Sequence, residues 1–134
     1  MPYTDLDRLK KRFSEKRLIE LTDDAGVGAV DTAVVDEIIA RASGEVDLIL
    51  GSVGFKTPVS PVPEWVRAAT ESIVVYRLYE RRGRIPEAVT AEYRAALERL
   101  AAIAKQEIQA RQAEDWTVEK DFGHRDRIFR EKMQ

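Results

Sequence analysis

The chain has 134 residues, of which 44% are hydrophobic and 34% are charged, and its formal net charge is −2. This composition predicts a folded, helix-rich domain and excludes a disordered chain. The absence of cysteine excludes disulfides and thiolate metal sites, and no apolar run approaches the roughly 20 residues of a membrane span. No signal peptide opens the sequence, so we expect synthesis in the cytoplasm and no membrane partner.

The charges are unevenly distributed along the chain. Asp23–Gly54 contains mostly acidic charges, whereas Phe55–Ile85 contains mostly basic ones. One interpretation is that these are solvated helix faces. The other is that opposite patches meet on neighbouring copies of the chain, with Arg81 and Arg82 as the main basic contacts.

Two short helices are predicted at the start of the chain. Thr4 is the expected N-cap of the first, because acidic residues follow it at once and basic residues come at the other end. Ser14 is the expected start of the second, in the stretch SEKRLIEL.

The next segment, Glu20–Asp31, reads ELTDDAGVGAVD and raises the question of a calcium loop. Helix–loop–helix calcium sites need oxygen ligands at defined loop positions. Three of those positions are occupied by Ala25, Val27 and Val34, which leaves too few oxygens to dehydrate the ion. We therefore predict a glycine-bearing turn without a structural metal, followed by a helix that Asp31 caps.

That third helix is predicted from Asp31 to about Leu50, because its apolar residues recur at helical spacing. Gly44 weakens this helix but is not expected to break it. After it comes GSVGFKTPVSPVP, whose prolines predict an extended connector.

Such a long, proline-stiffened connector is usually functional in a compact domain. We expect the connector to project and contact a neighbouring subunit or partner ring through residues at its start and middle, namely Phe55, Lys56, Pro58 and Pro61. The alternative is an ordinary surface loop with Phe55 folded back on the core.

Two long helices complete the predicted core. The first begins at Pro63 and ends at Gly83, and the second begins at Pro86. The fold class predicted from these elements is all-α: a compact bundle of about four helices with a proline-rich connector loop and an extended C-terminal arm. We divide the chain into a helical connector domain, residues 1–112, and an arm, residues 113–134.

The arm is rich in charges of both signs and contains scattered aromatic residues. It cannot form a core alone, so we expect it to be mobile in the free subunit and ordered in an assembly. Its expected partner contacts are Trp116, Phe122, Arg127 and Phe129.

The sequence does not provide the parts of an active site. His124 is the single histidine, there is no cysteine nucleophile, and neither glycine-rich phosphate-binding motif occurs. We therefore expect no enzyme activity, no cofactor and no bound metal. Four arginines between Arg77 and Arg84 raise DNA binding as an alternative, although the slightly acidic chain is unlike a dedicated DNA-binding domain.

Three motifs and the order of elements resemble a known family. The opening reads L-x-x-R-F-x-E-x-x-L-I-x-L-T-D from Leu9 to Asp23, and Y-R-L-Y stands at Tyr76–Tyr79. Between them, Val30–Asp47 is similar to a V-D-x-A…E-I-D pattern. From about Pro2 to about Gln106 the chain resembles the small neck protein of Mu-like tailed phages and prophages, one of the head–tail connector, adaptor or head-completion proteins.

The resemblance implies an α-helical virion neck component made in a bacterial host. Such proteins form rings, commonly of twelve copies, beneath the portal protein. The ring extends the channel through which genomic DNA passes and docks the next neck or tail-terminator protein. The alternative from a different class is a small helical binding module with a regulatory, DNA-contacting role, and an enzyme ranks third.

Overall fold

A computed structural model describes the backbone of residues 2–133 and the side chains of residues 2–114. Within residues 2–133 the chain forms helices and no strand, which confirms the all-α prediction for this part. The helices are α1 (Leu6–Arg12), α2 (Glu15–Thr22), α3 (Thr32–Val53), α4 (Glu64–Arg82) and α5 (Glu87–Met133). In the described part of the chain, none of them is long and apolar enough to cross a bilayer.

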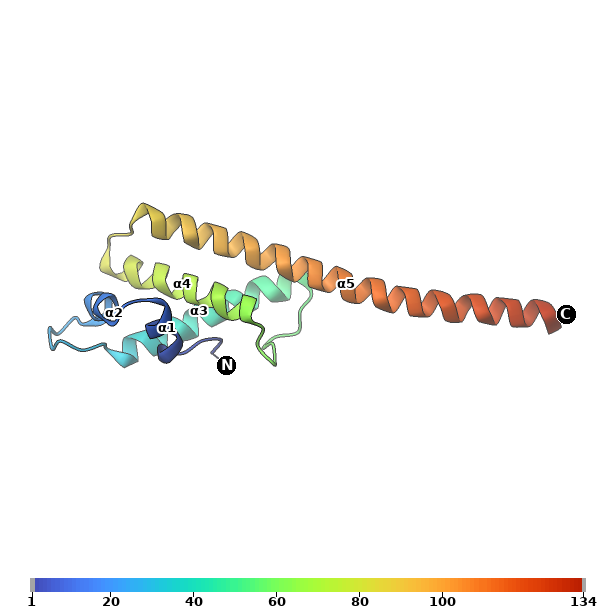
Figure 1. Cartoon of the computed structure of the whole chain (residues 1–134), viewed down its shortest axis with the longest axis horizontal. Helices are drawn as coiled ribbons and strands as arrows, with labels where there is room; N and C mark the ends of the chain where they lie inside the picture. The colour runs from blue at the N-terminus through green and yellow to red at the C-terminus, as the bar shows by residue number, and fades with distance from the viewer. Residues whose placement is uncertain (1, 134) are drawn as a thin grey trace.

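The three long helices lie side by side, with α4 between α3 and the first half of α5 (Figure 1). The two short helices lie at one end, where α1 contacts α3 and α2 contacts α4. At the other end α5 continues beyond both neighbours, so the C-terminus lies far from the helical body (Figure 1).

The core fills the space between the long helices, and its members are apolar residues at helical spacing. The largest side chains with almost no exposure are Tyr3, Leu9, Leu18, Leu50, Ile73, Leu78 and Leu100. Each large apolar side chain buried in this way contributes roughly 1.5–3 kcal/mol. The last helix contributes Ala96, Leu100 and Ala104 to this core.

The predicted cap of the first helix is wrong by one residue. Asp5, not Thr4, caps α1, since its carboxylate accepts a hydrogen bond of 2.9 Å from the backbone N–H of Arg8. Thr4 is buried, and its hydroxyl donates to Glu71 of α4 at 2.8 Å. A partner distant in sequence therefore engages the hydroxyl that would have capped the helix.

Most other predicted boundaries are confirmed. Ser14 caps α2, and Asp31 caps α3 by accepting from the N–H groups of Ala33 and Val34. Gly44 lies inside α3 without interrupting it. Gly83 ends α4 with a φ of 83°, in the left-handed region that favours glycine.

Candidate functional site

The loop between α2 and α3 is a turn organised by Asp23. Its carboxylate accepts hydrogen bonds from the backbone N–H groups of Val27 (3.0 Å) and Gly28 (2.8 Å). These two bonds, the Val27 bond first, hold the pKa of Asp23 below the usual range of an aspartate. The predicted turn is confirmed, and both oxygens of its first carboxylate are occupied by the loop's own backbone.

The next residue of this loop, Asp24, pairs with α4 of the same chain. Arg81 donates to its carboxylate at 2.6 Å and also to the backbone oxygen of Leu21 at 2.9 Å. Arg82 lies 3.2 Å from the same carboxylate. The two arginines that we expected to contact a neighbouring copy therefore form ion pairs within the chain. A charge-reversal test of contact between copies must also replace Asp24 with a basic residue, so that this internal pair is retained.

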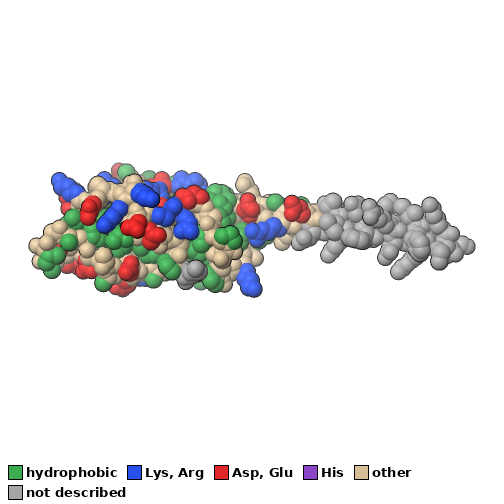
Figure 2. Space-filling view, turned by 60° about the horizontal axis from the view of Figure 1, so that its bottom comes forward, with side chains coloured by type: hydrophobic (Ala, Val, Ile, Leu, Met, Phe, Trp, Pro, Cys, Tyr) green, Lys and Arg blue, Asp and Glu red, His purple; other side chains and the backbone are tan. Residues whose placement is uncertain are grey.

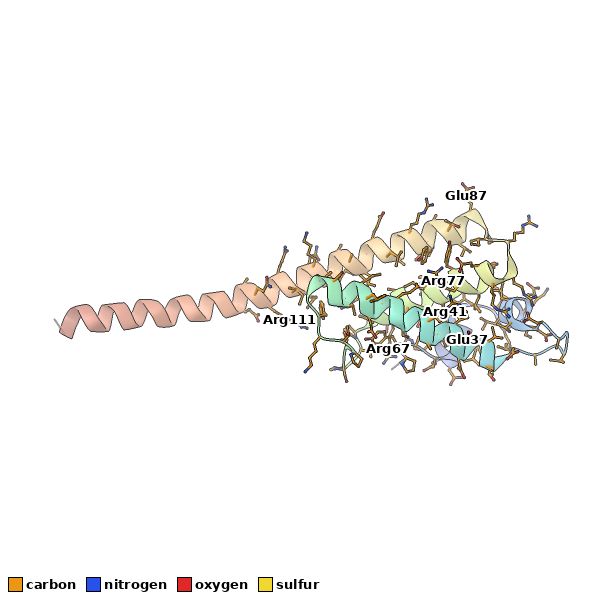
Figure 3. All side chains as sticks on the ribbon, turned by 180° about the vertical axis from the view of Figure 1, so that it is seen from behind. Glu37, Arg41, Arg67, Arg77, Glu87 and Arg111 are labelled. Atoms are coloured by element: carbon orange, nitrogen blue, oxygen red, sulfur yellow. The ribbon has the colours of Figure 1, made fainter. Side chains whose placement is uncertain are left out.

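A third arginine of α4, Arg77, lies between α3 and α5 (Figure 3). It forms an ion pair of 2.5 Å with Glu45 of α3 and one of 3.0 Å with Glu80. Its guanidinium also lies over the rings of Tyr76 and Tyr93, which stack with centroids 3.9 Å apart. Acidic and basic side chains are interspersed over the face of the body shown in Figure 2, and neither kind forms a separate patch there.

A buried carboxylate that we did not predict from the sequence joins the N-terminal segment to α4. Glu71 is 3% exposed and accepts hydrogen bonds from Thr4 (2.8 Å) and from Nε of Arg8 (2.9 Å), with Arg12 at 3.5 Å. The available signal was a glutamate among the apolar residues of α4's inner face, between Ala69 and Ile73. A carboxylate at such a position requires cationic partners from another element.

The connector between α3 and α4 does not project at Phe55. This residue is 8% exposed, and its ring packs edge-to-face on Trp65 with centroids 6.0 Å apart. The guanidinium of Arg111 lies 5.0 Å from the centre of the Phe55 ring. Our expectation for this residue is corrected in favour of the alternative, because burial against α4 and α5 removes an apolar ring from water.

The other connector residues that we singled out, Lys56, Pro58 and Pro61, are exposed. Their loop is held at Val59, whose backbone N–H donates to the hydroxyl of Tyr3 at 3.0 Å. That hydroxyl in turn donates to Asp47. Burial, followed by the bond to Asp47, raises the pKa of Tyr3, so the phenol stays protonated as this arrangement requires.

The remaining predicted contacts, Trp116, Phe122, Arg127 and Phe129, lie outside the residues whose side chains the structure describes. Their backbone belongs to α5, which runs to Met133. Among the described residues, no group of three or more histidine, cysteine, aspartate or glutamate side chains is placed to hold a metal ion.

Comparison with known proteins places most of the chain in a described family. A family model described as "Bacteriophage Mu, Gp36" matches residues 3–124, which is most of the chain. The matched range covers the helical body and part of the α5 extension beyond it. No curated protein matches the chain.

Proposed function

This chain belongs to the Bacteriophage Mu Gp36 family, and we propose that it is a structural protein of the virion neck. Copies of the chain, commonly twelve in the connector proteins that it resembles, form a ring beneath the portal protein. The ring extends the DNA channel and docks the next neck or tail protein. The chain has no catalytic role, requires no cofactor, and allows genomic DNA to pass without reading its sequence.

The observation that carries this proposal is the family match over residues 3–124. Two structural features support it. The chain is all-helical over residues 2–133, and its last helix continues beyond the body, where it is available to another protein (Figure 1). The connector between α3 and α4 lies near the end of the body from which α5 leaves (Figure 1). Lys56, Pro58 and Pro61 of this connector are exposed, so it offers a second contact to a neighbouring subunit.

The alternative of a DNA-contacting regulatory module has less support. DNA binding relies on cations that are free to neutralise phosphates. In α4, however, Arg77 pairs with Glu45 and Glu80, while Arg81 and Arg82 pair with Asp24. Carboxylates of the same chain thus already neutralise most of the arginine cluster.

The decisive experiment is reconstitution with the cognate portal protein. The purified chain is incubated with portal rings and imaged by electron microscopy, with portal alone as the control. We expect an additional ring stacked on one face of the portal. Portal particles that remain unchanged at saturating concentrations of the folded chain would contradict the proposal.

A further inference from the structure

A small, largely apolar pocket, here called the junction pocket, lies where the two short helices meet the long ones. Its volume is about 170 Å³. Phe13, between α1 and α2, and Val89, near the start of α5, line it together with Val75 of α4, which is only 6% exposed. A space of this size accommodates one large side chain, whereas small-molecule sites are usually about 300–1,000 Å³. The other lining residues are Arg12, Arg17, Ser72, Ala88 and Glu92.

The junction pocket has an available cation at its rim. Arg17 is exposed and, among the described residues, forms no ion pair. The single carboxylate of the lining, Glu92, already pairs with Arg99 at 2.6 Å. Residues 10–17, KKRFSEKR, contain five basic residues and one acidic residue. This side of the pocket therefore favours an apolar occupant that carries carboxylates.

The part of α5 beyond the body has the complementary pattern. Its backbone is helical to Met133, and at helical spacing Val118, Phe122 and Phe129 belong to one face, here called the arm face. A helix with such a face binds by laying it into an apolar groove. Along one edge of the arm face the sequence places three acidic residues, Asp115, Glu119 and Asp126.

The arm of a chain cannot reach the junction pocket of the same chain. Val89 and Phe122 belong to one continuous helix and are separated by about 50 Å along its axis, at about 1.5 Å per residue. In addition, α5 leaves the body at the end opposite to α1 and α2 (Figure 1). An arm that occupies the pocket therefore has to come from another copy.

We propose that the arm face of one copy binds the junction pocket of a neighbouring copy. Phe122 is the apolar anchor, and the acidic edge of the arm face lies beside Arg17. The opposite edge, which includes Arg125, then faces the α5 side of the pocket, where Glu92 lies. Charge complementarity of this kind sets the orientation of a contact and excludes wrong partners.

The symmetry of this contact follows from the places of its two surfaces. The arm face and the junction pocket are different surfaces at opposite ends of the chain, so the contact is head-to-tail. Every copy that joins leaves one pocket and one arm free, and repeated contacts close into a ring when the rotation between copies allows it. The inference thus identifies the subunit contact of the proposed neck ring, and its biological setting rests on that proposal.

A mixing experiment with two full-length variants tests the head-to-tail contact. Phe122→Glu removes the anchor of the arm face. Ala88→Glu introduces a carboxylate into the junction pocket at an exposed position in the first turn of α5, where an acidic residue is compatible with the helix. In sedimentation, each variant alone should stay monomeric, whereas their equimolar mixture should reach twice the monomer mass and stop there. Only one intact arm and one intact pocket are present in that mixture.

The unmodified chain and two matched controls complete the experiment. The average mass of the unmodified chain should rise with concentration beyond that of a dimer. Ile128→Glu, on another face of the arm, and Ala102→Glu, exposed on α5 about 20 Å from Ala88, should associate as the unmodified chain does. Circular dichroism verifies that each variant is folded, and Arg17→Glu replaces Ala88→Glu if the latter is unfolded.

Three results would overturn the proposal. They are an unmodified chain that stays monomeric at all concentrations, a mixture of the two variants that stays monomeric, and controls that lose association as fully as Phe122→Glu does. If the mixture stays monomeric while Phe122→Glu prevents docking on portal rings, the portal is the partner of the arm face. Sedimentation is carried out without the portal, so failure of this contact is distinguishable from failure of the proposed neck function.

Discussion

The carboxylate of Glu71 is buried between α1 and α4, and donors from Thr4, Arg8 and Arg12 surround it. Its side chain is only 5% exposed, whereas the arginines are about one-third exposed. An ionised carboxylate in this position is costly unless its hydrogen bonds are satisfied. Glu71 therefore determines where the N-terminal segment docks on the long helices.

Glu71→Gln should lower the free energy of unfolding by about 2–3 kcal/mol, because the amide retains the volume but loses the charge-assisted hydrogen bonds. Chemical denaturation monitored by circular dichroism measures this change. Glu64→Gln is the matched control, since Glu64 also pairs with Arg8 but its side chain is 72% exposed, and such surface pairs contribute about 0–1 kcal/mol. Equal losses of unfolding free energy in the two variants would show that the burial of Glu71 does not increase its contribution to stability.

Two neighbouring aspartates should titrate at low pH for different reasons. The pKa of Asp23 is lowered first by the backbone N–H of Val27, and that of Asp24 first by Arg81. Because both pKa values are depressed on folding, these groups stabilise the folded chain above the pKa of an unfolded aspartate. That contribution is lost as the pH falls through the folded values.

Carbonyl-detected NMR titration separates the two causes. In the parent chain both pKa values should lie below the usual aspartate value. In Arg81→Gln the pKa of Asp24 should rise towards that value, whereas the pKa of Asp23 should change little, because its hydrogen bonds come from the loop backbone. A parallel rise of both would mean that the turn itself depends on Arg81.

Among the elements, the connector between α3 and α4 serves as a junction as well as a loop. Its first residue, Gly54, ends α3 with a φ of 110°, and a β-carbon there would lie 4.0 Å from the side chain of Ile108 in α5. Phe55 follows and packs between Trp65 and Arg111. Three helices thus meet at the point where α5 leaves the body.

Phe55→Ala should destabilise the chain by about 3 kcal/mol, as expected for truncation of a buried aromatic ring. Lys56→Ala, the adjacent exposed residue, should leave stability within about 0.5 kcal/mol of the parent. Denaturant titration of both variants makes the comparison. A negligible effect of Phe55→Ala would mean that the ring is solvent-exposed in solution, as the connector hypothesis first required.

The whole molecule consists of a helical body and a last helix, α5, that extends beyond it (Figure 1). Ile108 and Arg111 of α5 still contact the body, at Gly54 and Phe55 of the connector. The backbone of α5 continues to Met133. Among the described residues, the hydrophobic core includes no residue after Ile108. We therefore expect the body to fold without the residues after Gln112.

Truncation after Gln112 should leave the helical body folded, with a melting temperature close to that of the full chain. The truncated protein should fail to dock on the portal, because it lacks the arm that we expect to reach it. Thermal denaturation and electron microscopy of portal mixtures are the two measurements. Docking equal to that of the full chain would show that the arm is dispensable.

Features that depend on near neighbours in the chain could be predicted from the sequence. Ser14 and Asp31 cap their helices, Gly83 ends α4, and the Asp23 turn closes on itself, because each involves hydrogen bonds or dihedral angles within a few residues. Helical periodicity likewise identified the apolar faces. These are local properties of the backbone and its side chains.

The partners of the charged and aromatic side chains could not be predicted from the sequence, because they depend on how the helices pack. Thr4 meets Glu71, Arg81 meets Asp24, and Phe55 packs under Arg111, with each pair more than 50 residues apart in sequence. Such pairs depend on which helices lie side by side and how they are rotated. The helical spacing of apolar residues predicts which face of a helix is buried. It does not determine which other helix covers that face, because many pairings of helices would bury a similar apolar area.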